Sequence, residues 1–191
     1  MRVRQARSVG TGVLALTVGL FGCSTADESA ETAEGEATAQ ESEATAEAAA
    51  PGADAAELWA ALADADYQGW DLWPGKGRMY AGTQPHGMLL TAYLNPAASD
   101  ALASGAPTMP DGAIIVKENY MPDSTLAAIT TMYKVEGFNP EAGDWYWVKY
   151  LPDGSVDGGG MMQGKVPGCI GCHGGQADND YIYTSKLGGG N

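Results

Sequence analysis

The 191-residue sequence has few basic residues, with 10 Lys and Arg against 24 Asp and Glu. Three of the ten lie before residue 23, so the remainder carries seven basic and 24 acidic residues, a net charge of −17. Proteins that bind nucleic acid need basic patches to neutralise phosphates. We therefore expect no nucleic-acid partner for this chain.

Histidine and cysteine are also scarce. The chain has two histidines, His86 and His173, and only Cys169 and Cys172 remain as cysteines beyond residue 23. A structural zinc site takes four ligands, and no second cysteine pair is present to complete one. A disulfide or a redox dithiol stays an alternative, although thioredoxin-like dithiols belong to a strand and helix pattern rather than a Gly-rich stretch.

One motif made from these scarce residues carries most of the chemistry: Cys169-Ile170-Gly171-Cys172-His173. Cys-x-x-Cys-His is the attachment signature of a c-type haem. Each thiol adds to one vinyl group of the porphyrin, and the histidine ligates the iron from the proximal side. The motif predicts one covalent haem c per chain, bound by Cys169 and Cys172, with His173 as the axial iron ligand.

The apolar run at residues 13–21 is too short to span a bilayer, and it follows three arginines. Residues 1–22 are therefore predicted to be a signal peptide. The segment Leu20-Phe21-Gly22-Cys23 resembles a bacterial lipobox, in which Cys23 becomes the lipidated first residue; an ordinary signal peptide is the alternative. Ser24 after Cys23 favours the outer membrane, with the domain facing the periplasm or the cell surface. Export agrees with haem attachment, which takes place outside the cytoplasm.

Residues 23–53 contain the lipidation site and a linker with neither aromatic nor basic residues. Eight acidic residues are spread among Ala, Thr, Ser and Gly, a composition that buries too little apolar surface to offset its ordering entropy. We expect a disordered tether between lipid and domain. The folded domain is assigned to residues 54–191, which hold all five tryptophans.

Strand-like segments precede the haem motif. Residues 87–94, 113–120, 126–135 and 144–151 are rich in β-branched and aromatic residues and are separated by Pro, Gly, Asn and Asp. Asp54 followed by Glu57 predicts a helix start, and Asn95-Pro96 predicts a second short helix that ends near Gly105. A late motif after strands differs from the small helical cytochromes, whose motif lies near the start of the domain.

This order of segments resembles the cytochrome P-460 family over residues 67–184. The matching segments are PHG at 85–87, LTAYLN at 90–95, PDGAIIVKE at 110–118, MYK at 132–134, DWYW at 144–147, the haem motif, and DYIY at 180–183. The resemblance implies an α+β fold, with an antiparallel β-sheet flanked by short helices and the haem bound near the C-terminus. It also implies a homodimer and a haem whose distal side is open.

Members of that family oxidise hydroxylamine or bind nitric oxide, and the enzymatic ones carry a covalent bond from a lysine to the porphyrin. The related cytochromes c-prime-beta lack the bond and bind gases behind an aromatic wall. Lys117 is our candidate for the bond, because strand alternation places it on one face with Ala113 and Ile115, and Glu118 on the other. A salt bridge or a snorkelling surface lysine is the alternative. Lys134 and Lys165 are less favoured candidates.

No acidic residue lies close before the haem motif, so a distal carboxylate has to come from elsewhere. Glu118 and Asp144 are the candidates. Met161 and Met162 are interpreted as packing residues rather than iron ligands. His86, between a proline and a glycine, is interpreted as a turn residue rather than a ligand.

Three functions stay open on the sequence. The first is a redox enzyme acting on hydroxylamine or nitric oxide, which passes electrons to a redox partner protein. The second is a module that binds nitric oxide or carbon monoxide without turnover, and the third is a periplasmic electron carrier with a filled sixth iron position. The expected partners are a small nitrogen-containing ligand or gas, the redox protein, and a membrane reached through the lipid anchor. Phe138 is the one phenylalanine of the domain, so tyrosines and tryptophans would have to line any aromatic distal wall.

Overall fold

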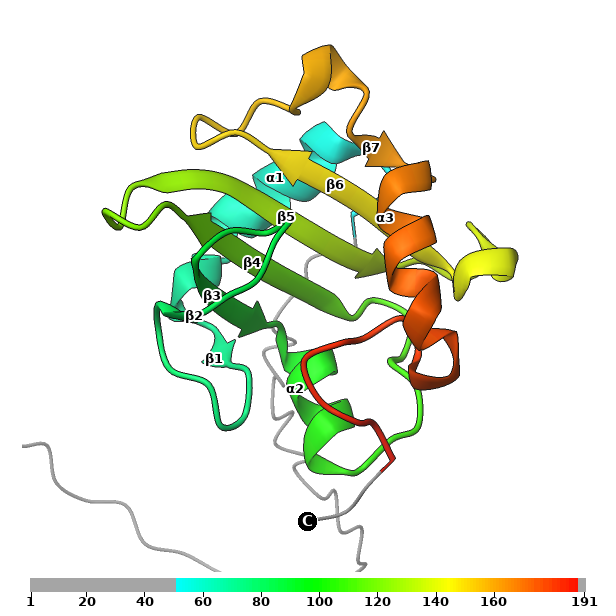
Figure 1. Cartoon of the computed structure of the whole chain (residues 1–191). Coiled ribbons are helices and arrows are strands. Elements are labelled where there is room, and N and C mark those ends of the chain that lie inside the picture. Colours follow the sequence, from blue (N-terminus) through cyan, green and yellow to red (C-terminus); the bar gives the residue numbers. More distant parts are fainter. Residues whose placement is uncertain (1–50, 189–191) are drawn as a thin grey trace, which may run out of the picture. The chain divides into compact units, whose positions relative to one another are not determined.

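The computed structural model describes residues 51–188. The predicted signal peptide at 1–22, Cys23, and all but the end of the predicted linker lie outside the described residues. The described part has the α+β fold expected from the sequence, an antiparallel sheet with short helices (Figure 1). Its helices are α1 (Ala55–Asp64), α2 (Pro96–Ala103) and α3 (Pro167–His173). Its strands are β1 (Asp71–Leu72), β2 (Tyr80–Ala81), β3 (Leu89–Leu94), β4 (Ile114–Tyr120), β5 (Leu126–Lys134), β6 (Trp145–Tyr150) and β7 (Gln163–Gly164).

The sheet runs in the order β1-β3-β4-β5-β6-β7, with β2 also paired to β3, and every pairing is antiparallel. The four strands predicted from composition are β3 to β6, the long central strands. In β4, Lys117 pairs with Ala92 of β3 and Thr130 of β5, so the strand lies between two neighbours along its length.

Helix α1 starts where the sequence predicts. The Asp54 side chain accepts hydrogen bonds from the backbone N–H groups of Ala56 and Glu57 at 2.9 and 3.0 Å, which satisfies two of the free amides of the first turn. The expected capping box differs in one bond, because the Glu57 carboxylate accepts from the backbone N–H of Gly52 instead of that of Asp54. Leu58 and Leu62 are fully buried, so this face of α1 packs on the sheet.

The two faces of the sheet carry different layers. Side chains of α1 and alternate sheet residues, including Val116 and Tyr150, form one buried cluster. The other cluster contains Ile115, Trp145 and Trp147 of the sheet, with Cys169 and Ile170 of α3 packed against it. In Figure 1, α1 lies behind the sheet and α3 in front of it. Among residues 51–188, no helix is both long and apolar enough to cross a membrane.

Candidate haem-binding site

Helix α3 carries the Cys-x-x-Cys-His motif on the face that meets the sheet. Pro167 is its first residue, a position where the missing N–H costs nothing because no intrahelical acceptor exists there. Cys169 and Cys172 are three residues apart and His173 follows Cys169 by four, so the three side chains share one side of the helix. Both thiols are free, so no disulfide joins them. Burial raises the pKa of Cys169, and the neighbouring Cys172 raises it further.

A cavity of about 310 Å³ lies against this face of α3, bordered by Cys169, Cys172 and His173. Its walls are mostly apolar and come from the sheet and the carboxyl-terminal segment: Trp73, Ile115, Met132, Trp147, Met162 and Ile182. An adjoining cavity of about 370 Å³ also borders Cys172 and His173. The buried indole N–H of Trp147 has no hydrogen-bond acceptor among the described residues. Apolar walls with one free donor suit a flat hydrophobic macrocycle that carries carboxylates, so the residues present fit haem.

One ring nitrogen of His173 is hydrogen-bonded to the backbone, and the other is free to bind a metal. Its Nδ1 donates to the backbone carbonyl of Tyr181 at 2.6 Å, which leaves Nε2 available to a metal. The ring packs against Trp147 and Tyr183, with centroid separations of 4.7 and 5.5 Å. Burial lowers the pKa of His173, which favours the neutral ring that ligates metals.

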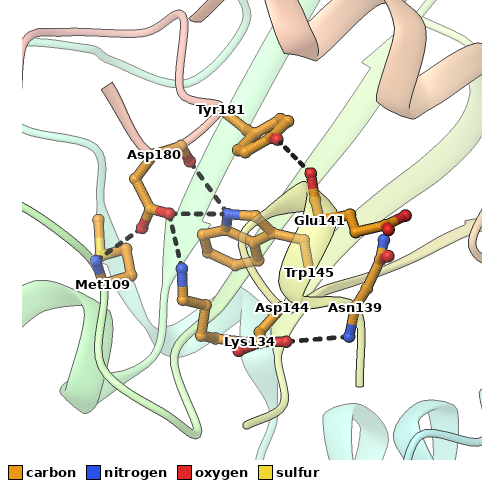
Figure 2. Close-up of polar contacts among 8 residues, drawn as sticks. All are labelled: Met109, Lys134, Asn139, Glu141, Asp144, Trp145, Asp180 and Tyr181. Atoms are coloured by element: carbon orange, nitrogen blue, oxygen red, sulfur yellow. Dashed lines mark hydrogen bonds and ion pairs between the residues drawn. The ribbon is translucent and has the colours of Figure 1, made fainter. Parts of the chain in front are cut away.

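A buried hydrogen-bond network holds the backbone at Tyr181, whose carbonyl accepts the hydrogen bond from His173 (Figure 2). The Asp180 carboxylate pairs with Lys134 Nζ at 2.6 Å and accepts hydrogen bonds from the backbone N–H of Met109 at 2.8 Å and from Trp145 Nε1 at 3.3 Å. The Asp180 carbonyl accepts from the same indole at 3.0 Å. Asp180 and Tyr181 have φ angles of 50° and 63°, a left-handed backbone that non-glycine residues adopt at a cost. These contacts therefore hold the strained turn that presents the Tyr181 carbonyl to His173.

Lys117 lies on the cavity face of β4, as strand alternation predicts. Its side chain borders both cavities, next to Cys172 and His173. Desolvation lowers the pKa of its amine. Within residues 51–188, no ion pair or side-chain hydrogen bond engages this amine. The salt-bridge alternative is therefore not what the structure shows.

The two less favoured lysines are engaged elsewhere. Lys134 pairs with Asp180, and Lys165 lies 5.5 Å from the centroid of the Phe138 ring. Neither borders the two cavities.

The candidate distal carboxylates do not border the cavity either. Glu118 is fully buried on the opposite face of β4, where it accepts four hydrogen bonds from side chains. The donors are Tyr67, Gln68, Tyr93 and Tyr120, at 3.0, 2.6, 2.8 and 2.6 Å. Burial alone would raise the pKa of Glu118, but these hydrogen bonds lower it below its usual value. Asp144 accepts from the backbone N–H of Asn139 at 2.9 Å, in the turn before β6 (Figure 2).

His86 lies in a turn, as the sequence predicts, and its backbone N–H donates to the Thr83 carbonyl at 3.2 Å; its place beside the haem motif was not predicted. It lies in the 82–88 loop between β2 and β3, borders both cavities, and its ring centroid is 6.0 Å from that of His173. Burial, together with the nearby charge of Lys117, lowers the pKa of His86 to about 4. A histidine in a sequence with only two was the available signal. Met162 borders the cavity as a packing residue, but Met161 is 78% exposed, so the packing prediction for it was wrong.

Comparison with known families agrees with this geometry. The family model described as Cytochrome P460 matches residues 64–184, which run from the end of α1 through the sheet and the haem motif. A search among curated proteins found no match to the chain. The match covers more than half of the sequence and contains the whole cavity wall. The chain therefore belongs to the cytochrome P460 family and is a haem-binding c-type cytochrome.

Proposed function

We propose that this protein is an exported, lipid-anchored cytochrome with one covalently bound haem, and that it carries out redox chemistry on hydroxylamine or nitric oxide. The observation that carries the proposal is the position of Lys117. It is a desolvated amine without a protein partner in the described domain, and it lies beside the Cys172 and His173 of the haem motif.

The chain's own residues account for haem attachment. Cys169 and Cys172 supply the two thiols for thioether bonds, and His173 offers Nε2 to the iron while Tyr181 holds the other ring nitrogen. A hydrogen bond from Nδ1 to a carbonyl sets the tautomer and raises the basicity of the ligating nitrogen. The Asp180 network keeps this carbonyl in place (Figure 2).

Lys117 has the chemistry that a third bond to the porphyrin requires. Desolvation favours its neutral form, and a neutral amine has the lone pair that forms a covalent bond. The position on a central strand limits its movement, because β4 is paired on both sides. We infer that Lys117 bonds to the ring, as in the hydroxylamine-oxidising members of the family. The step removes one N–H of the amine and one C–H of the ring, and its two electrons pass to an external oxidant.

Haem held by Cys169, Cys172 and His173 would supply an iron able to bind a nitrogen compound and to pass its electrons to a redox partner protein. Around it, Trp73, Ile115 and Trp147 present apolar surface that excludes water.

Location and assembly are also proposed here. The arginines, the short apolar run and the lipobox-like segment support lipidation of Cys23 and tethering to the outer membrane, facing the periplasm or the cell surface. The acidic linker supports a tether. Membership in a family whose members pair supports a homodimer.

A second candidate function is electron transfer without substrate binding. The observation that favours it is the proximity of the His86 and His173 rings, because a filled sixth iron position is typical of electron carriers.

Mass spectrometry of the digested holoprotein tests the proposal. We expect the haem peptide with Cys169 and Cys172 to carry the Lys117 peptide as well, and Lys117→Arg to release it. The wild-type protein should then reduce an added cytochrome when hydroxylamine is supplied. Haem on the cysteine peptide alone, together with no hydroxylamine-dependent reduction, would reject the enzymatic function.

A further inference from the structure

The loop that carries His86 is held tightly at both ends. The Gly82 N–H donates to the carbonyl of Met88 at 2.8 Å, which closes the loop at its base. A Cβ on Gly82 would lie 2.5 Å from the Gly87 carbonyl oxygen, and a Cβ on Gly87 would lie 2.9 Å from that of Tyr120. Gly87 also has a φ of 128°, which side-chain-bearing residues rarely adopt. The backbone on either side of His86 therefore depends on glycine, and its position relative to the sheet is well defined.

The two histidine rings have the separation of two ligands on one metal ion. Imidazole nitrogens bind metals such as zinc at about 2.0–2.1 Å, so two imidazoles on opposite sides of one ion have ring centres roughly 6 Å apart. The centroids of His86 and His173 are 6.0 Å apart, and their planes are inclined by 87°. A small molecule placed between the metal and one ring would add roughly 3 Å, the length of a hydrogen bond. The observed separation matches direct ligation by both rings.

The hydrogen bonds of the two rings point to the same conclusion. His173 uses Nδ1 for the Tyr181 carbonyl, and His86 has Nδ1 3.4 Å from Thr130 Oγ1. No hydrogen bond to Nε2 of His173 is present in the described domain, and the Asn119 side chain lies near the His86 ring. A ligating histidine ordinarily holds its second nitrogen on a protein group in this way. Both rings border the same cavities.

We propose that His86 is the sixth ligand of the haem iron in the resting protein, in place of the open distal side that the family resemblance implies. This inference rests on the haem attachment of the proposed function but not on its hydroxylamine chemistry. A small nitrogen ligand must displace His86 to reach the iron, so the 82–88 loop controls access to the metal. Other groups with a lone pair also border this cavity. Lys149 is paired with Asp157, and the Tyr183 hydroxyl donates to the Cys172 carbonyl. The rest are Lys117, Met132 and Met162, and none of these three has a ring that packs against His173.

The purified full-length holoprotein in its ferric state tests the proposal by absorption and electron paramagnetic resonance. We expect a six-coordinate low-spin signal in the wild type, loss of this signal in His86→Ala, and its return when imidazole is added to the variant. Lys165→Gln, at a lysine that borders neither cavity, is the control and should keep the low-spin signal. Removal of His86 raises the fraction of molecules whose sixth iron position is open to a ligand. The affinity for azide should therefore increase by about tenfold or more in His86→Ala.

Near-infrared magnetic circular dichroism of the unmodified wild type gives a second measurement that needs no variant. A charge-transfer band typical of two histidine ligands supports the proposal, and one typical of histidine with lysine or methionine overturns it. A five-coordinate high-spin wild type, or a low-spin signal that survives in His86→Ala, also overturns it. Low-spin haem with His86 bound but no hydroxylamine oxidation rejects the proposed enzyme while the ligand assignment stands. High-spin haem together with hydroxylamine oxidation rejects the ligand assignment of His86, while the proposed enzyme stands.

Discussion

Lys117 and Glu118 are neighbours in β4, yet their side chains occupy opposite faces of one sheet with opposite chemistry. The Glu118 side has a fully buried carboxylate that accepts from four donors. The Lys117 side has a cavity, a lysine amine without a partner in the described domain, and the haem motif. Burial costs free energy when a polar group has no partner, and proteins retain such groups where another molecule completes them. The difference teaches that one face is built for stability and the other for a cofactor.

The proposed covalent attachment of haem gives the largest expected difference between the faces. In a Lys117→Arg background, which removes the proposed lysine bond, the double variant with Cys169 and Cys172 replaced by Ala should lose covalent haem, because no other cysteine remains in the domain. Haem staining of denatured protein measures this. Cys23→Ser is the matched control: it should keep the stain and lose only the lipid. A stained band in the double variant would contradict attachment through the motif.

Within the cavity face, the ion pair that supports His173 should matter most for stability. Asp180→Asn leaves Lys134 without its buried partner, and breaking such a pair costs about 3–5 kcal/mol in the free energy of unfolding. Guanidinium titration of the holoprotein measures the change. We also expect a shift in the reduction potential, because the Tyr181 carbonyl then holds His173 less firmly.

The control for this variant is Asp157→Asn, which breaks the more exposed pair with Lys149. Exposed pairs contribute little because solvent screens them, so the unfolding free energy should hardly change. Equal losses in the two variants would show that burial of the Asp180 pair is not important.

On the opposite face, Glu118→Gln should lower the unfolding free energy by about 2–3 kcal/mol without altering the haem spectrum, because charged hydrogen bonds become neutral ones. The pKa of Glu118 is lowered in the folded protein, so its stabilisation is present above the unfolded pKa. It is lost as pH falls through the folded pKa. The difference between wild type and variant should therefore shrink in acid, below about pH 4. Glu136→Gln, at an exposed position, should show no such pH-dependent difference. An altered haem spectrum in Glu118→Gln would show that this face of the sheet also affects the haem site.

The smallest stability effect is expected for Lys117→Met. Removal of a desolvated amine without a partner should change the unfolding free energy by about 1 kcal/mol or less, in either direction. Guanidinium titration of Lys117→Met and Glu118→Gln under the same conditions compares their unfolding free energies directly. A loss as large as that of Glu118→Gln would mean that Lys117 also has a structural role.

Much of the fold followed from local pattern. Alternation in residues 113–120 predicted which face Lys117 and Glu118 occupy, and Asp54 and Asn95 marked helix starts where they occur. These features depend on neighbours within a few residues, so the sequence shows them directly. The placement of Cys169, Cys172 and His173 on one side of α3 was predictable, because thiol and imidazole spacing within a helix is local too.

The rest of the site depends on segments far apart in the chain. Asp180 meets Lys134 across 46 residues, and His86 reaches His173 from a loop that precedes it by 87 positions. No pattern within either segment encodes such a meeting, since it results from the packing of α3 and the 82–88 loop on the same sheet face. The sequence alone therefore determined the covalent haem motif, the strands and their faces. Only the tertiary structure decided which lysine lacks a partner and which carboxylates lie away from the cavity. It also decided that His86 lies against His173.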